Sequence, residues 1–209
     1  MIVEAISYRE AVGLFVRNHY LHRRPNVVFS FGLVSDGEIK GVITFGIPAS
    51  RDAQIGACPS SPNEVIELNR LWVCGSMPRN SETWFIAKEF NKMPPFIVIS
   101  YADTSEGHMG YVYLAANFRY AGWTDMDRKT PRFDYVVPGK HSRDAFRDGG
   151  PKFTERVRRK PKVRYWTTTG NRRERYSLER KCEWPSLDWK VIPSPVEHKT
   201  LRAVVGGNG

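Results

Sequence analysis

The sequence has few cysteines and no long apolar run. Its 3 cysteines among 209 residues are Cys58, Cys74 and Cys182, and no two have the CxxC spacing of zinc ligands or redox pairs. This excludes an all-cysteine zinc site and is typical of a protein in a reducing cytoplasm. No apolar stretch approaches the roughly 20 residues that cross a bilayer, and no secretory signal follows Met1. We therefore expect a cytoplasmic protein with no membrane partner.

Positive charge is concentrated in one part of the chain. The formal net charge is +10, from 32 Lys and Arg against 22 Asp and Glu. Residues 139–190 hold 16 of the basic and 7 of the acidic residues, a net charge of +9. The sequence thus predicts a nearly neutral domain over 1–138, a basic extension over 139–190 and a frayed tail over 191–209. Such an extension is typical of proteins that bind nucleic acid, although charge runs are more often solvated faces.

One stretch predicts a strand, a polar corner and a helix in succession. After two prolines, the apolar run at 96–99 predicts a strand buried on both faces. Polar residues follow at 100–108, and apolar residues then recur at helical spacing up to Gly122, which predicts a helix capped there. Asp103 falls in the corner, where ligands bind in open α/β sheets. A helix cap and a turn explain the same residues, and the pattern alone favours this plainer interpretation.

The rest of the chain predicts alternating strands and helices. The expected strands lie at 2–6, 27–34, 37–47 and 64–73. One helix begins at Tyr8, is capped by Ser7 and ends before Pro25, and another covers 83–92 and is capped by Asn80 or Ser81. A loop is expected at 48–63 and a final hairpin at 123–138. The turn at 35–37, Ser-Asp-Gly, is a strong hairpin signal. This order predicts a mixed α/β sheet flanked by helices rather than a doubly wound sheet.

Short motifs in the central stretch resemble a known family. SYAD at 100–103, GH at 107–108 and GYVYLAANFRYAG at 110–122 resemble the signature of the Mom family of phage DNA-modification proteins. The resemblance implies a fold related to the GCN5-related N-acetyltransferases for residues 1–138. It also implies conversion of adenine in duplex DNA to N6-(carbamoylmethyl)adenine, which shields phage DNA from restriction. A phage protein of this kind would act in the cytoplasm of the host cell.

The resemblance also implies a set of catalytic residues. The family's His-Tyr pair, arginine, aspartate and tyrosine fall here on His19, Tyr20, Arg70, Asp103 and Tyr113. Because the adenine amine is weakly nucleophilic, a carboxylate or an imidazole must accept a proton as it reacts. Asp103 either orients or deprotonates the amine, and Arg70 holds an anionic group or a developing negative charge. Each residue also has a plainer explanation, as a packing residue, a cap or an ion-pair partner. Taken singly, each plainer explanation is favoured.

A metal and a group donor are further expectations. The family resemblance implies iron, and two His with one carboxylate suit Fe(II), so His19, Asp103 and His108 are the candidate ligands. The spacing alone does not demand a metal. The usual phosphate-binding loop of acyltransferases should lie at 74–83, where the sequence is CGSMPRNSET with one glycine and a proline. This departure disfavours acetyl-CoA and leaves the donor of the transferred group unidentified.

The basic extension interleaves cations with aromatic rings. Cations suit phosphates, and flat rings suit stacking on bases, so we expect the extension to bind double-stranded DNA. The candidate contacts are Arg156, Arg158, Arg159, Lys160, Lys162, Arg164, Tyr165, Trp166, Arg172 and Arg173. Two other functions stay open: an acyltransferase for a small amine or a protein, and a DNA-binding protein without chemistry. The sequence does not decide the oligomeric state, and a homodimer is one option.

Overall fold

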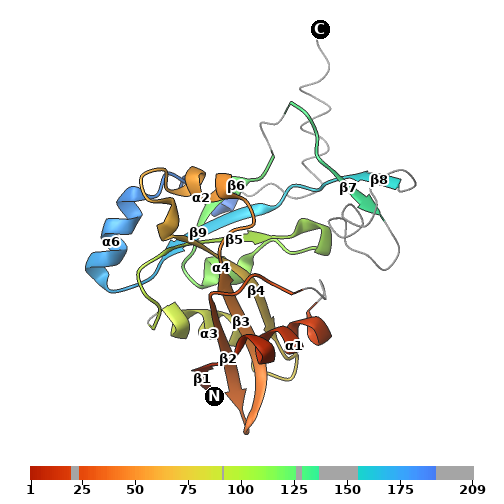
Figure 1. The fold of residues 1–209 in the computed structure, drawn as a ribbon, viewed down its shortest axis with the longest axis vertical. Helices are drawn as coiled ribbons and strands as arrows, with labels where there is room; N and C mark the ends of the chain where they lie inside the picture. The colour runs from red at the N-terminus through yellow and green to blue at the C-terminus, as the bar shows by residue number, and fades with distance from the viewer. Residues whose placement is uncertain (20–23, 91, 126–128, 137–154, 192–209) are drawn as a thin grey trace.

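The molecule is built on one mixed sheet. The computed structural model describes residues 1–19, 24–90, 92–125, 129–136 and 155–191. Its seven-stranded sheet has the order β1-β2-β3-β4-β5-β9-β6 (Figure 1). The strands are β1 (Ile2–Ala5), β2 (Phe29–Ser35), β3 (Glu38–Gly46), β4 (Val65–Val73), β5 (Ile97–Ala102), β9 (Val163–Thr168) and β6 (Arg119–Trp123). Among the described strands of this sheet, only β4 and β5 pair in parallel. The expected mixed α/β class is confirmed.

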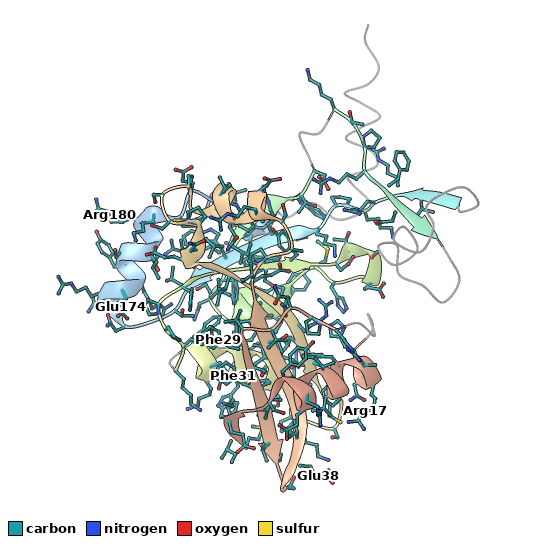
Figure 2. The ribbon with its side chains drawn as sticks, in the orientation of Figure 1. Arg17, Phe29, Phe31, Glu38, Glu174 and Arg180 are labelled. Carbon is teal, nitrogen blue, oxygen red and sulfur yellow. The ribbon has the colours of Figure 1, made fainter. Side chains whose placement is uncertain are left out.

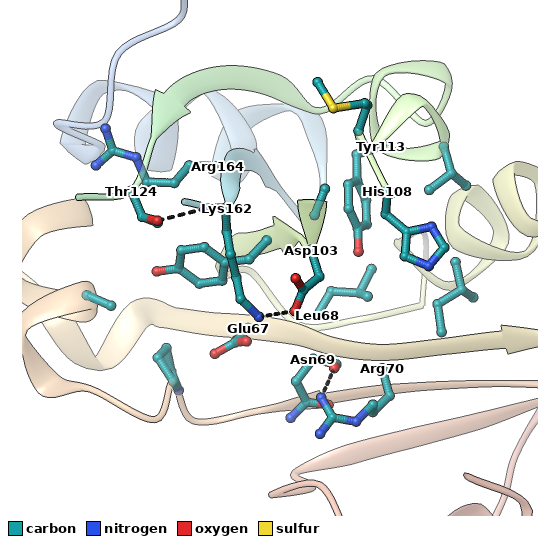
Figure 3. Close-up of a pocket in the computed structure, with 18 of the residues that line it drawn as sticks. Glu67, Leu68, Asn69, Arg70, Asp103, His108, Tyr113, Thr124, Lys162 and Arg164 are labelled. Carbon is teal, nitrogen blue, oxygen red and sulfur yellow. Dashed lines mark hydrogen bonds and ion pairs between the residues drawn. The ribbon is translucent and has the colours of Figure 1, made fainter. Parts of the chain in front are cut away.

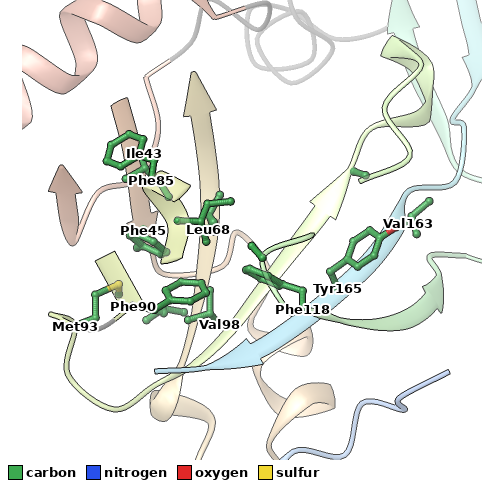
Figure 4. Close-up of a cluster of buried hydrophobic side chains, with 14 of the residues drawn as sticks. Ile43, Phe45, Leu68, Phe85, Phe90, Met93, Val98, Phe118, Val163 and Tyr165 are labelled. Atoms are coloured by element: carbon green, nitrogen blue, oxygen red, sulfur yellow. The ribbon is translucent and has the colours of Figure 1, made fainter. Parts of the chain in front are cut away.

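Helices cover both faces of the sheet. They are α1 (Tyr8–Asn18), α2 (Arg51–Ala57), α3 (Ser81–Phe90), α4 (Tyr111–Ala115) and α6 (Arg172–Lys181), with 3-10 turns η1 (Pro62–Glu64), η2 (Thr104–Glu106) and η3 (Trp189–Val191). The larger core lies between the sheet and α3 with α4, and includes Phe45, Phe90 and Tyr165 (Figure 4). Smaller cores lie under α2 with α6 and under α1. No helix among the described residues is long and apolar enough to span a membrane.

Local signals in the first third of the chain are confirmed. Ser7 caps α1 through a reciprocal capping box with Glu10, which satisfies backbone N–H groups that the first turn leaves free. The β2–β3 hairpin turns at Asp36 and Gly37, both with positive φ, as a two-residue turn matched to strand twist requires. The strand expected at 64–73 is β4. These elements depend on neighbours in the sequence.

Three local predictions are wrong. The segment 48–63 is not a loop throughout, because it contains α2 and η1. The helix expected to run to Gly122 ends at Ala115, since Asn117 adopts a positive φ of 61° and the chain leaves as β6. The hairpin expected at 123–138 is replaced by longer-range pairing, because β7 (Phe133–Val136) pairs with β8 (Glu155–Arg158) in a separate ribbon.

The structure differs from the expected division of the chain at residue 138. β9 lies inside the main sheet, between β5 and β6 and antiparallel to both. Residues 163–168 therefore complete the main sheet instead of belonging to an appended extension. Tyr165 is 0% and Trp166 2% exposed, so the expectation that these rings stack on DNA bases is wrong. Residues 137–154 and 192–209, which include the first part of the expected extension and most of the expected tail, lie outside the described residues.

Glu89 is a fully buried acid on α3. Its side chain is 0% exposed, neither carboxylate oxygen has a hydrogen-bond partner, and the Lys92 ammonium lies 3.9 Å away. Burial raises the pKa of Glu89 from 4.5 to about 7, against the weaker opposing effect of Lys92. The folded state therefore holds this proton more tightly than the unfolded chain does.

Glu89→Gln is expected to stabilise the protein at pH 8 but not at pH 4. Between the unfolded pKa of 4.5 and the folded pKa of about 7, rising pH deprotonates the unfolded chain first and lowers stability. The free energy of unfolding falls by at most about 3 kcal/mol over this range, because each pKa unit corresponds to about 1.36 kcal/mol. Urea unfolding of both chains at pH 4, 6 and 8 measures it. Parallel stability curves for the two chains across this range would contradict the raised pKa.

Candidate active site

Two parallel strands diverge and open a cleft. β4 and β5 pair at 65–67 with 97–99 and then separate, while β5 stays paired with β9 on its other edge and β4 stays paired with β3. The cleft has a volume of about 1420 Å³ and is lined by residues of β4, the corner after β5, α4 and β9. The Ser100 hydroxyl donates to the Leu68 carbonyl across the divergence at 2.9 Å. Asp103 directly follows β5 and therefore lies beyond the point where β4 and β5 separate.

A β-bulge in β4 aims two charged residues at the cleft. Thr44 pairs with Arg70 and the adjacent Phe45 pairs with Leu68, so Asn69 is the extra residue. Asn69 is held by Thr44, whose hydroxyl donates to its side-chain oxygen at 2.7 Å. The bulge shifts the alternation by one, and both Glu67 and Arg70 line the cleft (Figure 3). Sequence spacing alone would have placed these two side chains on opposite faces.

Asp103 is fixed in an ion pair with Lys162. The Lys162 ammonium donates to Oδ2 of Asp103 at 2.6 Å, and the backbone N–H of Ser105 donates to Oδ1 at 3.1 Å (Figure 3). The Asp103 side chain is 13% exposed. Burial raises its pKa, but the hydrogen bonds from Lys162 and Ser105 together outweigh burial and lower the pKa overall. Asp103 is both the cap of η2, as the plainer interpretation expected, and an ionised group in the cleft.

Tyr113 lies between the cleft and the core. Its ring packs on Phe118 and Tyr165, with centroids 5.3 Å apart in both cases. Burial raises the pKa of the phenol; a hydrogen bond with Ser100 and the charge of Arg70 oppose this, while the charge of Glu67 adds to it. Tyr113 therefore stays protonated near neutral pH, close enough to Glu67 and Arg70 to sense both charges.

Glu67 and Lys162 join the site without having been predicted as catalytic. Glu67 lines the cleft, and its charge also raises the pKa of Tyr101, for which burial is the main cause. Lys162 was expected to contact DNA, but its ammonium faces Asp103 within the cleft. Glu67 could have been noticed as an acid between the apolar residues Ile66 and Leu68 of an expected strand. Nothing in the sequence indicates the pairing of Lys162 with Asp103, which are 59 residues apart.

The histidines are near the site, but no metal-binding group is formed among the described residues. His19 follows α1, is 8% exposed, packs edge-on against Phe15 and lines the cleft, as does His108. No three His, Cys, Asp or Glu side chains of the described chain are grouped to hold a metal ion. Asp103, a candidate ligand, is already bonded to Lys162 and Ser105. The described residues therefore do not fit the expected iron, and Tyr20 lies outside them.

The predicted DNA contacts divide into two groups. The first group lies on β8, on β9 and between them: Arg156, Arg158, Arg159, Lys160, Lys162 and Arg164. Arg172 and Arg173 begin α6, beyond the other end of β9. Figure 2 shows the labelled residues of α6, Glu174 and Arg180, on the side of the molecule away from β7 and β8. The cleft is lined by Arg159, Lys162 and Arg164 of the first group, whereas Arg172 and Arg173 are not among the described residues that line it.

Comparison with known proteins decides the family. The family model of the Mom proteins matches residues 1–179. The chain belongs to the Mom protein family. Methylcarbamoylase mom of Escherichia phage Mu is 33% identical over 114 residues, a match that covers 52% of this chain and 44% of the phage protein. This Mom chain thus matches less than half the length of that relative.

Solved structures show a distant likeness to acetyltransferases. A GNAT-family acetyltransferase from Bacillus cereus is 13% identical with a TM-score of 0.43, covering 81% of this Mom chain and 98% of the enzyme. The GNAT-like decarboxylase GphF, solved with isobutyryl-CoA, is 12% identical with a TM-score of 0.44, covering 79% of this chain and 98% of its own.

In the Mom chain, Glu82 of the first turn of α3 lines the cleft. A carboxylate there disfavours a diphosphate at that helix N-terminus.

Proposed function

We propose that this Mom chain modifies adenine in duplex DNA at N6, forming N6-(carbamoylmethyl)adenine and protecting the DNA from restriction. The observation that carries the proposal is the cleft of a Mom-family chain in which Asp103, Lys162, Glu67, Arg70 and Tyr113 come together. Carboxylates beside cations suit an amine that must lose a proton while charge develops nearby. Such a protein would act on phage DNA in the host cytoplasm.

Asp103 serves as a fixed hydrogen-bond acceptor for the adenine amine. Its lowered pKa keeps the carboxylate ionised near neutral pH, which suits orienting an N–H group. The same lowered pKa makes it a weak base, so full proton transfer to Asp103 is disfavoured. Lys162 holds the carboxylate at one oxygen and thereby fixes its direction. Of the two roles expected for Asp103, the lowered pKa favours orienting the amine over removing its proton.

Glu67 is the second carboxylate and the better placed proton acceptor. It stands on the β4 side of the cleft, across from the corner that carries Asp103 (Figure 3). Arg70, three residues further along the same bulged strand, supplies a positive charge for an anionic part of the donor. Tyr113 stays protonated and offers a hydroxyl at the floor of the cleft. We assign no binding residue to the rest of the donor of the carbamoylmethyl group.

The amine of a paired adenine is stacked inside the duplex. Enzymes that act on such a base extrude it into a pocket, at a cost of a few kcal/mol for unstacking and unpairing. The cleft is large enough for an adenine together with a small donor group, and Lys162, Arg164 and Arg159 provide positive charge along its edge. These features support double-stranded DNA as the substrate of this chain.

Nucleoside mass spectrometry of DNA from cells that express the chain tests the proposed function. We expect a deoxyadenosine heavier by the carbamoylmethyl group, and none in cells that express Glu67→Gln at the same level. DNA without any modified deoxyadenosine would overturn the proposal and favour a DNA-binding protein without chemistry. An acetylated small amine or protein, with unmodified DNA, would favour the acyltransferase function instead.

A further inference from the structure

A two-stranded ribbon is inserted between two neighbouring strands of the main sheet. β6 and β9 pair with each other, and the chain between them forms β7 and β8. The ribbon projects from the sheet, on the opposite side of the molecule from α6 (Figure 1). It does not extend the main sheet. An isolated two-stranded ribbon is marginally stable in water, so we expect this ribbon to pack against the surface of a binding partner.

The pairing register places an aromatic residue and a cation on one face of the ribbon. Phe133 pairs with Arg158, and the next pair, Asp134 with Val157, belongs to the other face. Phe133 is 40% exposed, and Arg158 and Lys160 are exposed as well. Exposed cations beside an apolar ring complement a polyanion that also offers flat or methyl-bearing surfaces.

The stem of the ribbon is tied to the cleft. Arg159 donates to Oδ1 of Asp134 at 2.6 and 3.0 Å, and its backbone N–H donates to the Arg132 carbonyl at 2.9 Å. Thr124 exchanges two hydrogen bonds with Lys162, at 2.8 and 2.9 Å. Lys162 in turn holds Asp103. A few residues therefore connect the ribbon to the carboxylate that faces the substrate.

We propose that the β7–β8 ribbon enters the major groove of the duplex beside the adenine in the cleft. This inference rests on the proposed function, because it takes the N6 amine as the reacting group. While the adenine is still paired, before its extrusion, N6 lies on the major-groove edge, and that groove admits a two-stranded ribbon, whereas the minor groove is about half as wide. The ribbon is attached at the rim of the cleft, and its exposed cations suit the phosphates that border the groove.

Duplex binding measured over a salt series tests which basic group contacts DNA. Arg158→Glu and Arg173→Glu change the net charge equally, one on the ribbon and one on α6. We expect Arg158→Glu to weaken binding about tenfold or more and to flatten the salt slope by about 1, and Arg173→Glu to change affinity less than about twofold. Equal losses in both variants, or a larger loss in Arg173→Glu, would overturn the placement of DNA at the ribbon.

A second comparison separates the two faces of the ribbon. Phe133→Ala removes the ring from the Arg158 face, and Val157→Thr changes the other face while keeping a β-branched residue. We expect Phe133→Ala to weaken duplex binding by about fivefold or more and Val157→Thr to leave it within about twofold. Circular dichroism and thermal melting establish that the variants are folded. A loss confined to Val157→Thr would overturn the proposed face.

The groove itself is tested with the unaltered protein. One duplex carries glucosylated hydroxymethylcytosine on both sides of the adenine, which fills the major groove, and another carries netropsin, which fills the minor groove. We expect the first to bind about tenfold more weakly and the second as well as plain duplex. Competition by netropsin with no effect of glucosylation would overturn the proposal.

Duplex binding tests the groove proposal, and nucleoside mass spectrometry tests the proposed function. If modified deoxyadenosine is found but glucosylation does not weaken binding, the groove proposal fails and the proposed function stands. If glucosylation weakens binding through Arg158 and Phe133 but no modified deoxyadenosine forms, the ribbon's docking is supported and the proposed function fails.

Discussion

Asp103→Asn is expected to lower the rate of adenine modification by about 10²–10³-fold, the usual range when one preorganised hydrogen-bonding group of an active site is removed. Asparagine keeps the side-chain oxygen that accepts from the Ser105 N–H, so the cap of η2 survives. It loses the negative charge that Lys162 neutralises and that the adenine amine would meet. Quantitative nucleoside mass spectrometry of a duplex treated with purified protein measures the rate.

The control variant for Asp103→Asn is Ser105→Ala, which removes one hydrogen bond and keeps the carboxylate. We expect it to retain most of the activity. Full activity of Asp103→Asn would remove Asp103 from the mechanism. Loss of folding in both variants would assign the residue to the turn alone.

The pH dependence of the Asp103–Lys162 pair follows from the lowered pKa of the carboxyl. The folded pKa lies below the usual value of 3.8, so the pair's contribution to stability is complete above that pH and is lost as the pH falls through the lowered pKa. Modification between pH 6 and 8 should therefore not depend on titration of Asp103. Any pH dependence there belongs to another group of the cleft.

Local signals in the sequence were sufficient for the elements and for part of the site. The cap at Ser7 and the turn at Asp36 and Gly37 are decided by residues within three positions of each other. The change in composition at Ser100 indicated a corner after β5, but the strand continues to Ala102 and the corner begins at Asp103. The motif resemblance then placed Asp103 and Arg70 together, and both line the cleft.

Long-range pairing escaped the sequence pattern. The segment 163–168 alternates poorly and lies among basic residues, yet it completes the sheet because β5 and β6 both present an unpaired edge to it. The bulge at Asn69 depends on its partner strand β3, so the joint orientation of Glu67 and Arg70 was not readable either. Charge was a misleading guide here, since it assigned a core strand to a DNA-binding extension.

Trp166→Ala is expected to lower the free energy of unfolding by about 3–5 kcal/mol, as loss of a large buried aromatic does. The ring is 2% exposed, packs in the core under α2 and α6, and its Nε1 donates to the Pro185 carbonyl at 2.9 Å. The Arg119 guanidinium lies 4.7 Å from the ring centroid. Alanine would leave a cavity and an unpaired carbonyl, and urea unfolding at pH 7 measures the loss.

Tyr176→Ala is the matched control for Trp166→Ala. It removes another aromatic ring from the basic region, but this ring is 64% exposed on α6, so we expect a change within about 0.5 kcal/mol. Trp166→Phe should recover part of the lost stability, because it refills much of the cavity but not the hydrogen bond. If Trp166→Ala instead unfolds like the unaltered chain and loses duplex affinity with an unchanged salt slope, the ring stacks on a base after all and its burial in β9 does not describe the DNA-bound protein.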